Sequence, residues 1–133
     1  MDAENKKSSV LIIDDNPSFR EIFSAKLKSA GFDVYEADGG ESGLAKVREV
    51  VPDLILLDIE MPGMSGIQVI NQMKVDPNLQ HIKVVFLTNH GESGESDVWL
   101  DKKFASEIGA EGYIRKTDDL DKIVQELKTF FEH

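Results

Sequence analysis

Short hydrophobic runs recur along the chain, and three of them end in a side chain that carries oxygen. The runs are 10–13, followed by Asp14-Asp15; 54–57, followed by Asp58; and 84–87, followed by Thr88. Apolar runs of this length bounded by turn signals are typical of strands buried on both faces. Ligands of open parallel α/β sheets bind at the carboxyl edge of the strands, so these polar endings are candidates for one common site.

Two weaker strands are expected at 34–37 and 113–114, and the second runs into Arg115-Lys116-Thr117. Between the strands, apolar residues recur at helical spacing. The expected helices are 17–30, one after Asp38 that ends before Pro52, one after the Gly/Pro-rich turn 61–66 that ends before Pro77, 97–108, and one from Thr117 or Asp118 to the end of the chain. Alternation of five strands with five helices predicts a doubly wound parallel α/β sheet between two helical layers.

Several helix ends carry local signals. Asn16 can cap a helix whose first position is Pro17, and Gly31 follows its last residue. The Asp-x-x-Glu spacing from Asp38 to Glu41 resembles a capping box for the next helix.

Length and composition fit one domain of ordinary globular composition. The chain has 133 residues, of which 41% are hydrophobic and 30% charged, and no apolar stretch approaches the roughly eighteen residues of a membrane span. We expect residues 1–8 to form a disordered tail without a signal peptide, and 9–133 to form a single domain, cytoplasmic and without an output domain. The absence of cysteine excludes disulfides, thiolate catalysis and thiolate metal sites.

The formal net charge of −10 argues against nucleic acid or an anionic membrane as the primary partner. A cation is more plausible. If the first and third strands are neighbours, Asp14, Asp15 and Asp58 crowd three carboxylates together, and Mg²⁺ suits such oxygen ligands. Thr88 would add a hydroxyl and Lys116 a positive charge, which together suit phosphoryl transfer to a carboxylate. Asp58 is the best candidate nucleophile, although each residue taken alone is also explained as a turn, a strand end or a solvated charge.

The whole chain resembles the receiver domain of response regulators in two-component signalling. The matching features are Asp14-Asp15, the Leu-Leu-Asp-Ile-Glu-Met-Pro-Gly-Met-Ser-Gly segment at 56–66, Thr88, the Gly-Ala-Glu-Gly-Tyr stretch at 109–113, and Lys116. The resemblance implies a flavodoxin-like three-layer fold with strand order 2-1-3-4-5.

The resemblance also implies a role for each site residue. Asp58 would accept a phosphoryl group from a sensor histidine kinase or phosphotransfer protein. Asp15, Asp58 and the backbone carbonyl of Glu60 would bind Mg²⁺, with Asp14 contributing through water. Thr88 and Lys116 would bind the phosphoryl oxygens. The only chemistry would be self-phosphorylation and self-dephosphorylation, so the chain would signal rather than act as an enzyme.

A switch is implied as well. Thr88 would move toward the phosphoryl group and Tyr113 would turn inward, which would remodel the face formed by the fourth helix, fifth strand and fifth helix for a downstream protein. From the residues alone, the favoured explanation of Tyr113 is a half-buried aromatic on an edge strand.

The sequence departs from the family pattern in three places. Asn89 stands where the family usually has a small residue, and Thr117 follows Lys116 where a proline is usual, so we expect a trans bond there. The loop 89–96 is longer than usual and is either a passive insertion or a lid or docking element. Glu60, Asn89 and His90 occupy positions that tune dephosphorylation in the family.

Two other functions remain open at this point. A phosphatase of the haloacid dehalogenase type uses a similar set of Asp, Thr, Lys and Mg²⁺, and Glu60 stands where its acid would lie, but such enzymes usually need a cap. A degenerate receiver that acts only through protein contacts is the second alternative.

Overall fold

The structure is a computed structural model that describes residues 7–88 and 108–131. Within these residues there are five strands and four helices, which alternate along the chain except between the last two strands. The elements are β1 (Ser9–Ile13), α2 (Pro17–Ser29), β2 (Asp33–Ala37), α3 (Gly40–Val50), β3 (Leu54–Asp58), α4 (Gly66–Lys74), β4 (Lys83–Thr88), β5 (Gly112–Arg115) and α6 (Leu120–Thr129). The helix expected over 97–108 and the loop 89–96 lie outside the described residues, apart from Ile108.

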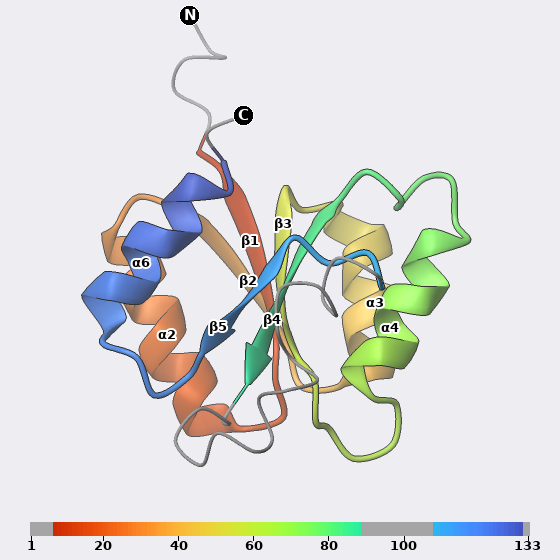
Figure 1. The fold of residues 1–133 in the computed structure, drawn as a ribbon, viewed down its shortest axis with the longest axis horizontal. Coiled ribbons are helices and arrows are strands. Elements are labelled where there is room, and N and C mark those ends of the chain that lie inside the picture. The colour runs from red at the N-terminus through yellow and green to blue at the C-terminus, as the bar shows by residue number, and fades with distance from the viewer. Residues whose placement is uncertain (1–6, 89–107, 132–133) are drawn as a thin grey trace, which may run out of the picture.

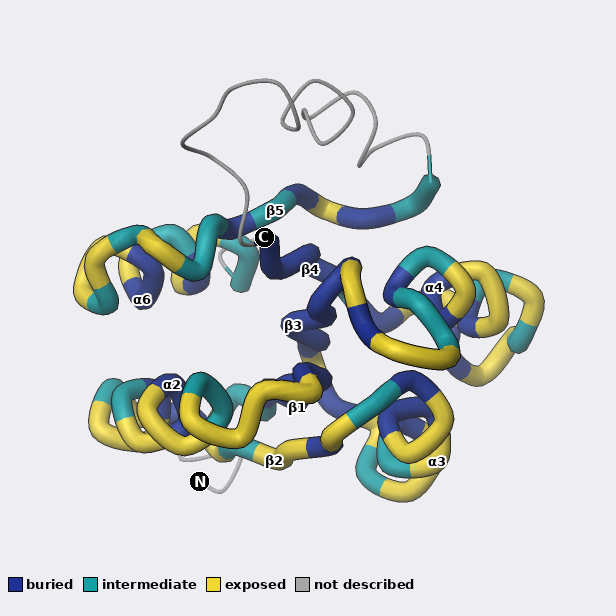
Figure 2. The backbone as a smooth tube through the Cα atoms, turned by 90° about the horizontal axis from the view of Figure 1, so that it is seen from below, coloured by how far each residue is buried: buried dark blue, intermediate teal, exposed yellow. Residues whose placement is uncertain are grey.

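The strands form one parallel sheet in the order β2-β1-β3-β4-β5. In the register, Ile13 lies beside Leu57 and Thr88 lies beside Arg115. Helices α2 and α6 cover one face of the sheet and α3 and α4 cover the other, so the fold has three layers (Figure 1 and, end-on, Figure 2). The doubly wound α/β fold and the strand order are therefore confirmed.

The core lies on both faces of the central strands. Every residue of the runs 10–13 and 54–57 has 0% of its surface exposed. Leu11, Ile13 and Leu57 pack in the cluster that includes residues of α3 and α4, whereas Val10 and Ile12 pack in the cluster on the opposite face. Burial on both faces explains why these runs are continuously apolar, and it fixes where the side chain after each run must lie.

The start of α2 follows the sequence signals. The side-chain oxygen of Asn16 accepts a hydrogen bond from the N–H of Phe19 at 3.1 Å, and Pro17 is the first helical residue. Gly31, at a φ of 102°, follows the C-cap of this helix. The helix therefore begins directly after the Asp14-Asp15 pair, in a direction fixed by its own cap.

The capping box proposed at Asp38 is wrong. The N-cap of α3 is Gly39, which makes no side-chain hydrogen bond to the helix. The carboxylate of Asp38, one residue before this cap, accepts a hydrogen bond from the hydroxyl of Ser42 at 2.8 Å. A capping box does form at α4, between Ser65 and Gln68.

The cap expected at Thr117 or Asp118 is also displaced. The N-cap of α6 is Asp119, whose carboxylate accepts hydrogen bonds from the N–H groups of Asp121 and Lys122. The N–H of Asp118 is used in a turn that closes on the carbonyl of Arg115 at 3.1 Å, and this turn delays the start of the helix. No peptide bond among the described residues is cis, so Lys116 and Thr117 are joined by a trans bond as expected.

Val51 ends α3 in a left-handed conformation. Its φ is 44° and its ψ is 70°, and its N–H donates to the carbonyl of Val47 at 2.8 Å. This conformation is costly for a β-branched residue and is normally occupied by glycine.

We expect Val51→Gly to raise the free energy of unfolding by about 1 kcal/mol, because removing the left-handed strain outweighs the added entropy of the unfolded chain. Val50→Gly, one residue earlier inside the helix, is the matched control and should destabilise by a similar amount. Urea unfolding of both variants measures the difference. A lower midpoint for Val51→Gly would contradict the strain argument.

Candidate functional site

Three carboxylates meet at the carboxyl edge of the sheet. Asp14 follows β1 and Asp58 ends β3, and these strands are neighbours. One oxygen from each of Asp14, Asp15 and Asp58 lies within 4.8 Å of the others. Asp14 and Asp58 are buried, with 0% and 4% of their surfaces exposed, whereas Asp15 is exposed. The cluster therefore extends from the buried sheet edge to the solvent.

Lys116 brings a positive charge into this cluster from the end of β5. Its ammonium lies 2.5 Å from Oδ2 of Asp14 and 3.5 Å from Oδ2 of Asp58, and its side chain is only 7% exposed. The structure thus brings together Asp14, Asp15, Asp58 and Lys116, as their positions at strand ends predicted.

Thr88 lies beside Lys116 at the end of β4. It is 3% exposed, and its carbonyl accepts a hydrogen bond from the backbone N–H of Lys116 at 2.8 Å. A direct hydrogen bond therefore joins the backbones of Thr88 and Lys116.

The loop after Asp58 is held by backbone contacts. The N–H of Glu60 donates to Oδ1 of Asp58 at 3.2 Å, and the N–H of Gly66 donates to the carbonyl of Ile59 at 3.0 Å. A Cβ atom on Gly66 would lie 2.5 Å from the carbonyl oxygen of Asp58. This is a steric clash, so any other residue at this position would force the backbone to move. Gly66 is therefore needed for the close approach of α4 to the strand end that carries Asp58.

The environment raises the pKa of Asp58 from 3.8 to about 6. Burial is the largest cause, because it disfavours the charged form. The ammonium of Lys116 lowers the pKa, the carboxylate of Asp14 raises it, the N–H of Glu60 lowers it, and Asp15 raises it slightly. One lysine does not compensate for the burial of a charged Asp58 among acidic neighbours.

The residues of the cluster fit a magnesium ion. Carboxylate oxygens are the hard ligands that Mg²⁺ prefers, and three are available here. Oδ2 of Asp14 is buried, and its close contact is the ion pair with the ammonium of Lys116. Three carboxylates share this one ammonium, so the cluster keeps an excess of negative charge that a further cation would balance.

The remaining predicted residues lie around this cluster or outside the described part of the chain. Glu60 is exposed, two residues after Asp58. Tyr113 lies on β5, half-buried, and packs against the core cluster of the α3 and α4 face. Asn89 and His90 are not among the described residues.

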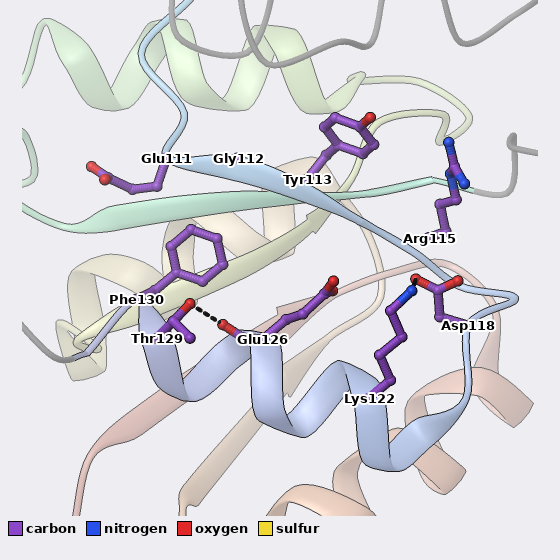
Figure 3. Close-up of a pocket in the computed structure, with 9 residues that line it drawn as sticks. All are labelled: Glu111, Gly112, Tyr113, Arg115, Asp118, Lys122, Glu126, Thr129 and Phe130. Atoms are coloured by element: carbon purple, nitrogen blue, oxygen red, sulfur yellow. Dashed lines mark hydrogen bonds and ion pairs between the residues drawn. The ribbon is translucent and has the colours of Figure 1, made fainter.

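A hollow opens between β5 and α6 (Figure 3). Its volume is about 660 Å³, and it holds none of the three aspartates. It is lined by Glu111, Gly112, Tyr113, Arg115, Asp118, Lys122, Glu126, Thr129 and Phe130. The hollow therefore belongs to the face that includes Tyr113 rather than to the acidic cluster.

Two residues of the first turn of α2 contact the site and were missed from the sequence. The guanidinium of Arg20 donates to the carbonyl of Asp14 at 2.7 Å and pairs with Glu36 at 3.4 Å. The ring of Phe19 lies under the ammonium of Lys116. A cation near the N-terminus of a helix is unfavourable with respect to the helix dipole, so Arg20 was a signal that an acceptor lies nearby.

The pKa of Asp58 predicts how stability depends on pH without metal. Between pH 4 and pH 6 the folded protein keeps a proton that the unfolded chain has released, so the free energy of unfolding falls as the pH rises through this range. We expect Asp58→Asn to lack this fall and to exceed the wild type by up to about 3 kcal/mol at pH 7. Urea unfolding in EDTA across this range measures it.

Asp53→Asn, which changes the exposed carboxylate just before β3, is the matched control and should keep the wild-type difference between pH 4 and pH 6. If Asp58→Asn and the wild type gave parallel curves, the raised pKa of Asp58 would be refuted.

Comparison with known proteins places the chain in a family. A family model of the response regulator receiver domain matches residues 10–128. The polar-differentiation response regulator DivK of Brucella ovis is 30% identical over 122 residues, which cover 92% of this chain and 94% of DivK.

Solved structures agree with this match. The chemotaxis protein CheY4 of Vibrio cholerae has a TM-score of 0.80 and 26% identity, and the match covers 93% of this chain and 98% of CheY4. The N-terminal domain of a response regulator receiver protein from Methanoculleus marisnigri has a TM-score of 0.72 and 28% identity, with 94% and 97% covered. With its acidic edge, lysine and strand order, this chain belongs to the receiver domain family of two-component response regulators.

Proposed function

We propose that Asp58 accepts a phosphoryl group from a sensor histidine kinase or a phosphotransfer protein. The observation that carries the proposal is the convergence of Asp14, Asp15 and Asp58 with the ammonium of Lys116 at one edge of the sheet. A carboxylate oxygen of Asp58 forms a bond to phosphorus while the phosphorus–nitrogen bond of the phosphohistidine breaks, and the imidazole leaves with the electron pair. Lys116 then stabilises charge on the transferring phosphoryl oxygens.

Magnesium is the cofactor that we propose for this step. Asp15, Asp58 and the backbone carbonyl of Glu60 would hold it, with Asp14 contributing through water. The ion would supply positive charge beside the phosphoryl oxygens. The support for this assignment is the oxygen donor set of Asp14, Asp15 and Asp58, whose three negative charges exceed the single positive charge of Lys116.

The proposed switch couples Asp58 to the face around β5. The hydroxyl of Thr88 would contact a phosphoryl oxygen. The backbone carbonyl of Thr88 accepts a hydrogen bond from the N–H of Lys116. Movement of Thr88 would therefore reach the end of β5, where Tyr113 would turn inward. The face for a downstream protein would include β5, α6 and the helix expected over 97–108, and the hollow in Figure 3 lies on it.

Receiver domains are signalling domains rather than classical enzymes, and we propose that the chemistry here is limited to self-phosphorylation and self-dephosphorylation. Glu60, Asn89 and His90 would tune the loss of the phosphoryl group. Among the described residues, no helix is long and apolar enough to cross a bilayer. We propose that residues 9–133 act as one cytoplasmic receiver domain after a short tail, 1–8, through protein contacts rather than through direct binding to nucleic acid or membrane.

Phosphorylation by a small donor tests the proposal. After incubation with acetyl phosphate and Mg²⁺, we expect intact-protein mass spectrometry to show one added phosphoryl group, which disappears in EDTA and in Asp58→Asn. Asp53→Asn, which alters an exposed carboxylate near the start of β3, should be labelled like the wild type. Absence of the added mass, with a small donor and with histidine kinases alike, would refute the phosphoacceptor role.

Arg20 provides a test of the magnesium assignment. Its guanidinium holds the carbonyl that joins the two aspartates of the pair, so Arg20→Lys keeps the charge but loses the planar contact to Asp14 and Glu36. We expect the affinity for Mg²⁺ to fall about three- to tenfold, a loss of about 1 kcal/mol. Isothermal titration calorimetry measures it.

The matched control is Arg48→Lys, because Arg48 pairs with Asp76 on the α3 and α4 side. This variant should bind Mg²⁺ like the wild type. Equal affinities for both variants would show that the contact of Arg20 does not order the metal ligands.

A further inference from the structure

The ammonium of Lys116 lies over the face of the Phe19 ring. The distance from Nζ to the ring centroid is 4.7 Å, which is within the range of a cation–π interaction. The same nitrogen lies 2.5 Å from Oδ2 of Asp14 and 3.5 Å from Oδ2 of Asp58. The ring and the two carboxylates therefore all contact one positive charge.

Burial makes the contact with the ring significant. The side chain of Lys116 is only 7% exposed, so water does little to screen its charge. A cation–π interaction is stronger for a desolvated cation than for an exposed one. The face of the Phe19 ring therefore stabilises a buried positive charge that has little contact with solvent.

The ring of Phe19 is itself held in place. It stacks on Phe23 with a centroid distance of 5.0 Å and an interplanar angle of 28°. Its backbone N–H is the group that the side chain of Asn16 caps. Stacking on Phe23 fixes the ring of Phe19, and the cap of α2 fixes its backbone. The ring can therefore restrict the position of the flexible Lys116 side chain.

The side chain of Lys116 needs a contact that restricts its position. Its backbone is anchored by the hydrogen bond from its N–H to the carbonyl of Thr88, but a lysine side chain is long and carries its charge as a single point. Thr117 follows it through a trans bond, so no proline ring restricts the chain after the lysine. The direction of the ammonium is left to its side-chain contacts.

We propose that Phe19 is a positioning residue, whose ring face holds the ammonium of Lys116 between Asp14 and Asp58, where it meets the phosphoryl oxygens. The proposal rests on the proposed phosphoacceptor function. It differs from simple core packing, which would depend on the volume of the side chain and not on the electrons of the ring.

Stepwise fluorination of Phe19 separates these two roles, because fluorine removes the negative potential of the ring face and changes its shape little. We expect the rate of phosphorylation by acetyl phosphate to fall with each added fluorine, to about one tenth in the trifluoro form, equivalent to about 1.4 kcal/mol. The unfolding midpoint should change little. The same series at Phe32, which packs on Phe131 at 5.4 Å, is the matched control and should leave the rate unchanged.

Two ordinary variants support the series. Phe19→Tyr keeps an aromatic face and should phosphorylate within about twofold of the wild type, whereas Phe19→Leu keeps an apolar side chain and should be about tenfold slower. A rate that is insensitive to fluorination, or equal in the leucine and tyrosine variants, would overturn the positioning role and leave Phe19 as a packing residue.

A readout without phosphorylation distinguishes failure of this inference from failure of the proposed function. In the unphosphorylated protein, the ring current of Phe19 should shift the NMR signals of the Lys116 ε-methylene protons upfield, and Phe19→Leu should abolish that shift. A wild type that accepts no phosphoryl group but shows the shift would overturn the function and keep the contact. Absence of the shift would overturn the contact itself.

Discussion

Electrostatic repulsion among three carboxylates, held together by strands that cannot move apart, is the constraint on which the site depends. β1 and β3 are buried on both faces, and their hydrogen-bonded register places the ends of the two strands side by side. Moving Asp14 away from Asp58 would therefore expose apolar core, at about 25 cal/mol for each Å². Packing of the core on both faces of β1 and β3 thus keeps Asp14 close to Asp58 despite their repulsion.

The repulsion is relieved only in part by the protein itself. Among the described residues, Lys116 pairs with two of the acids, and the pKa of Asp58 is nevertheless raised to about 6, mainly by burial and to a smaller extent by Asp14 and Asp15. A site in this state favours any ligand that adds positive charge.

The residues at the carboxyl edge of the sheet could be predicted from the sequence, whereas the contacts around them could not. The runs 10–13 and 54–57 were recognisable as strands because burial on both faces leaves a continuous apolar pattern, and the positions of Asp14 and Asp58 follow from that. The cap at Asp119 was misplaced because adjacent polar residues compete for the same role, and the turn closed by Asp118 decides between them. Contacts between elements far apart in the chain leave no periodic signal.

The first turn of α2 is the clearest case of such a contact, and it completes the argument about charge. Its cap at Asn16 sets the direction of the helix, which brings Arg20 to the carbonyl of Asp14 and Phe19 to the ammonium of Lys116. One helical turn thus contacts both the backbone carbonyl of Asp14 and the ammonium of Lys116. Because both contacts start from one rigid element, the separation of the opposite charges depends on the helix start as well as on the strands.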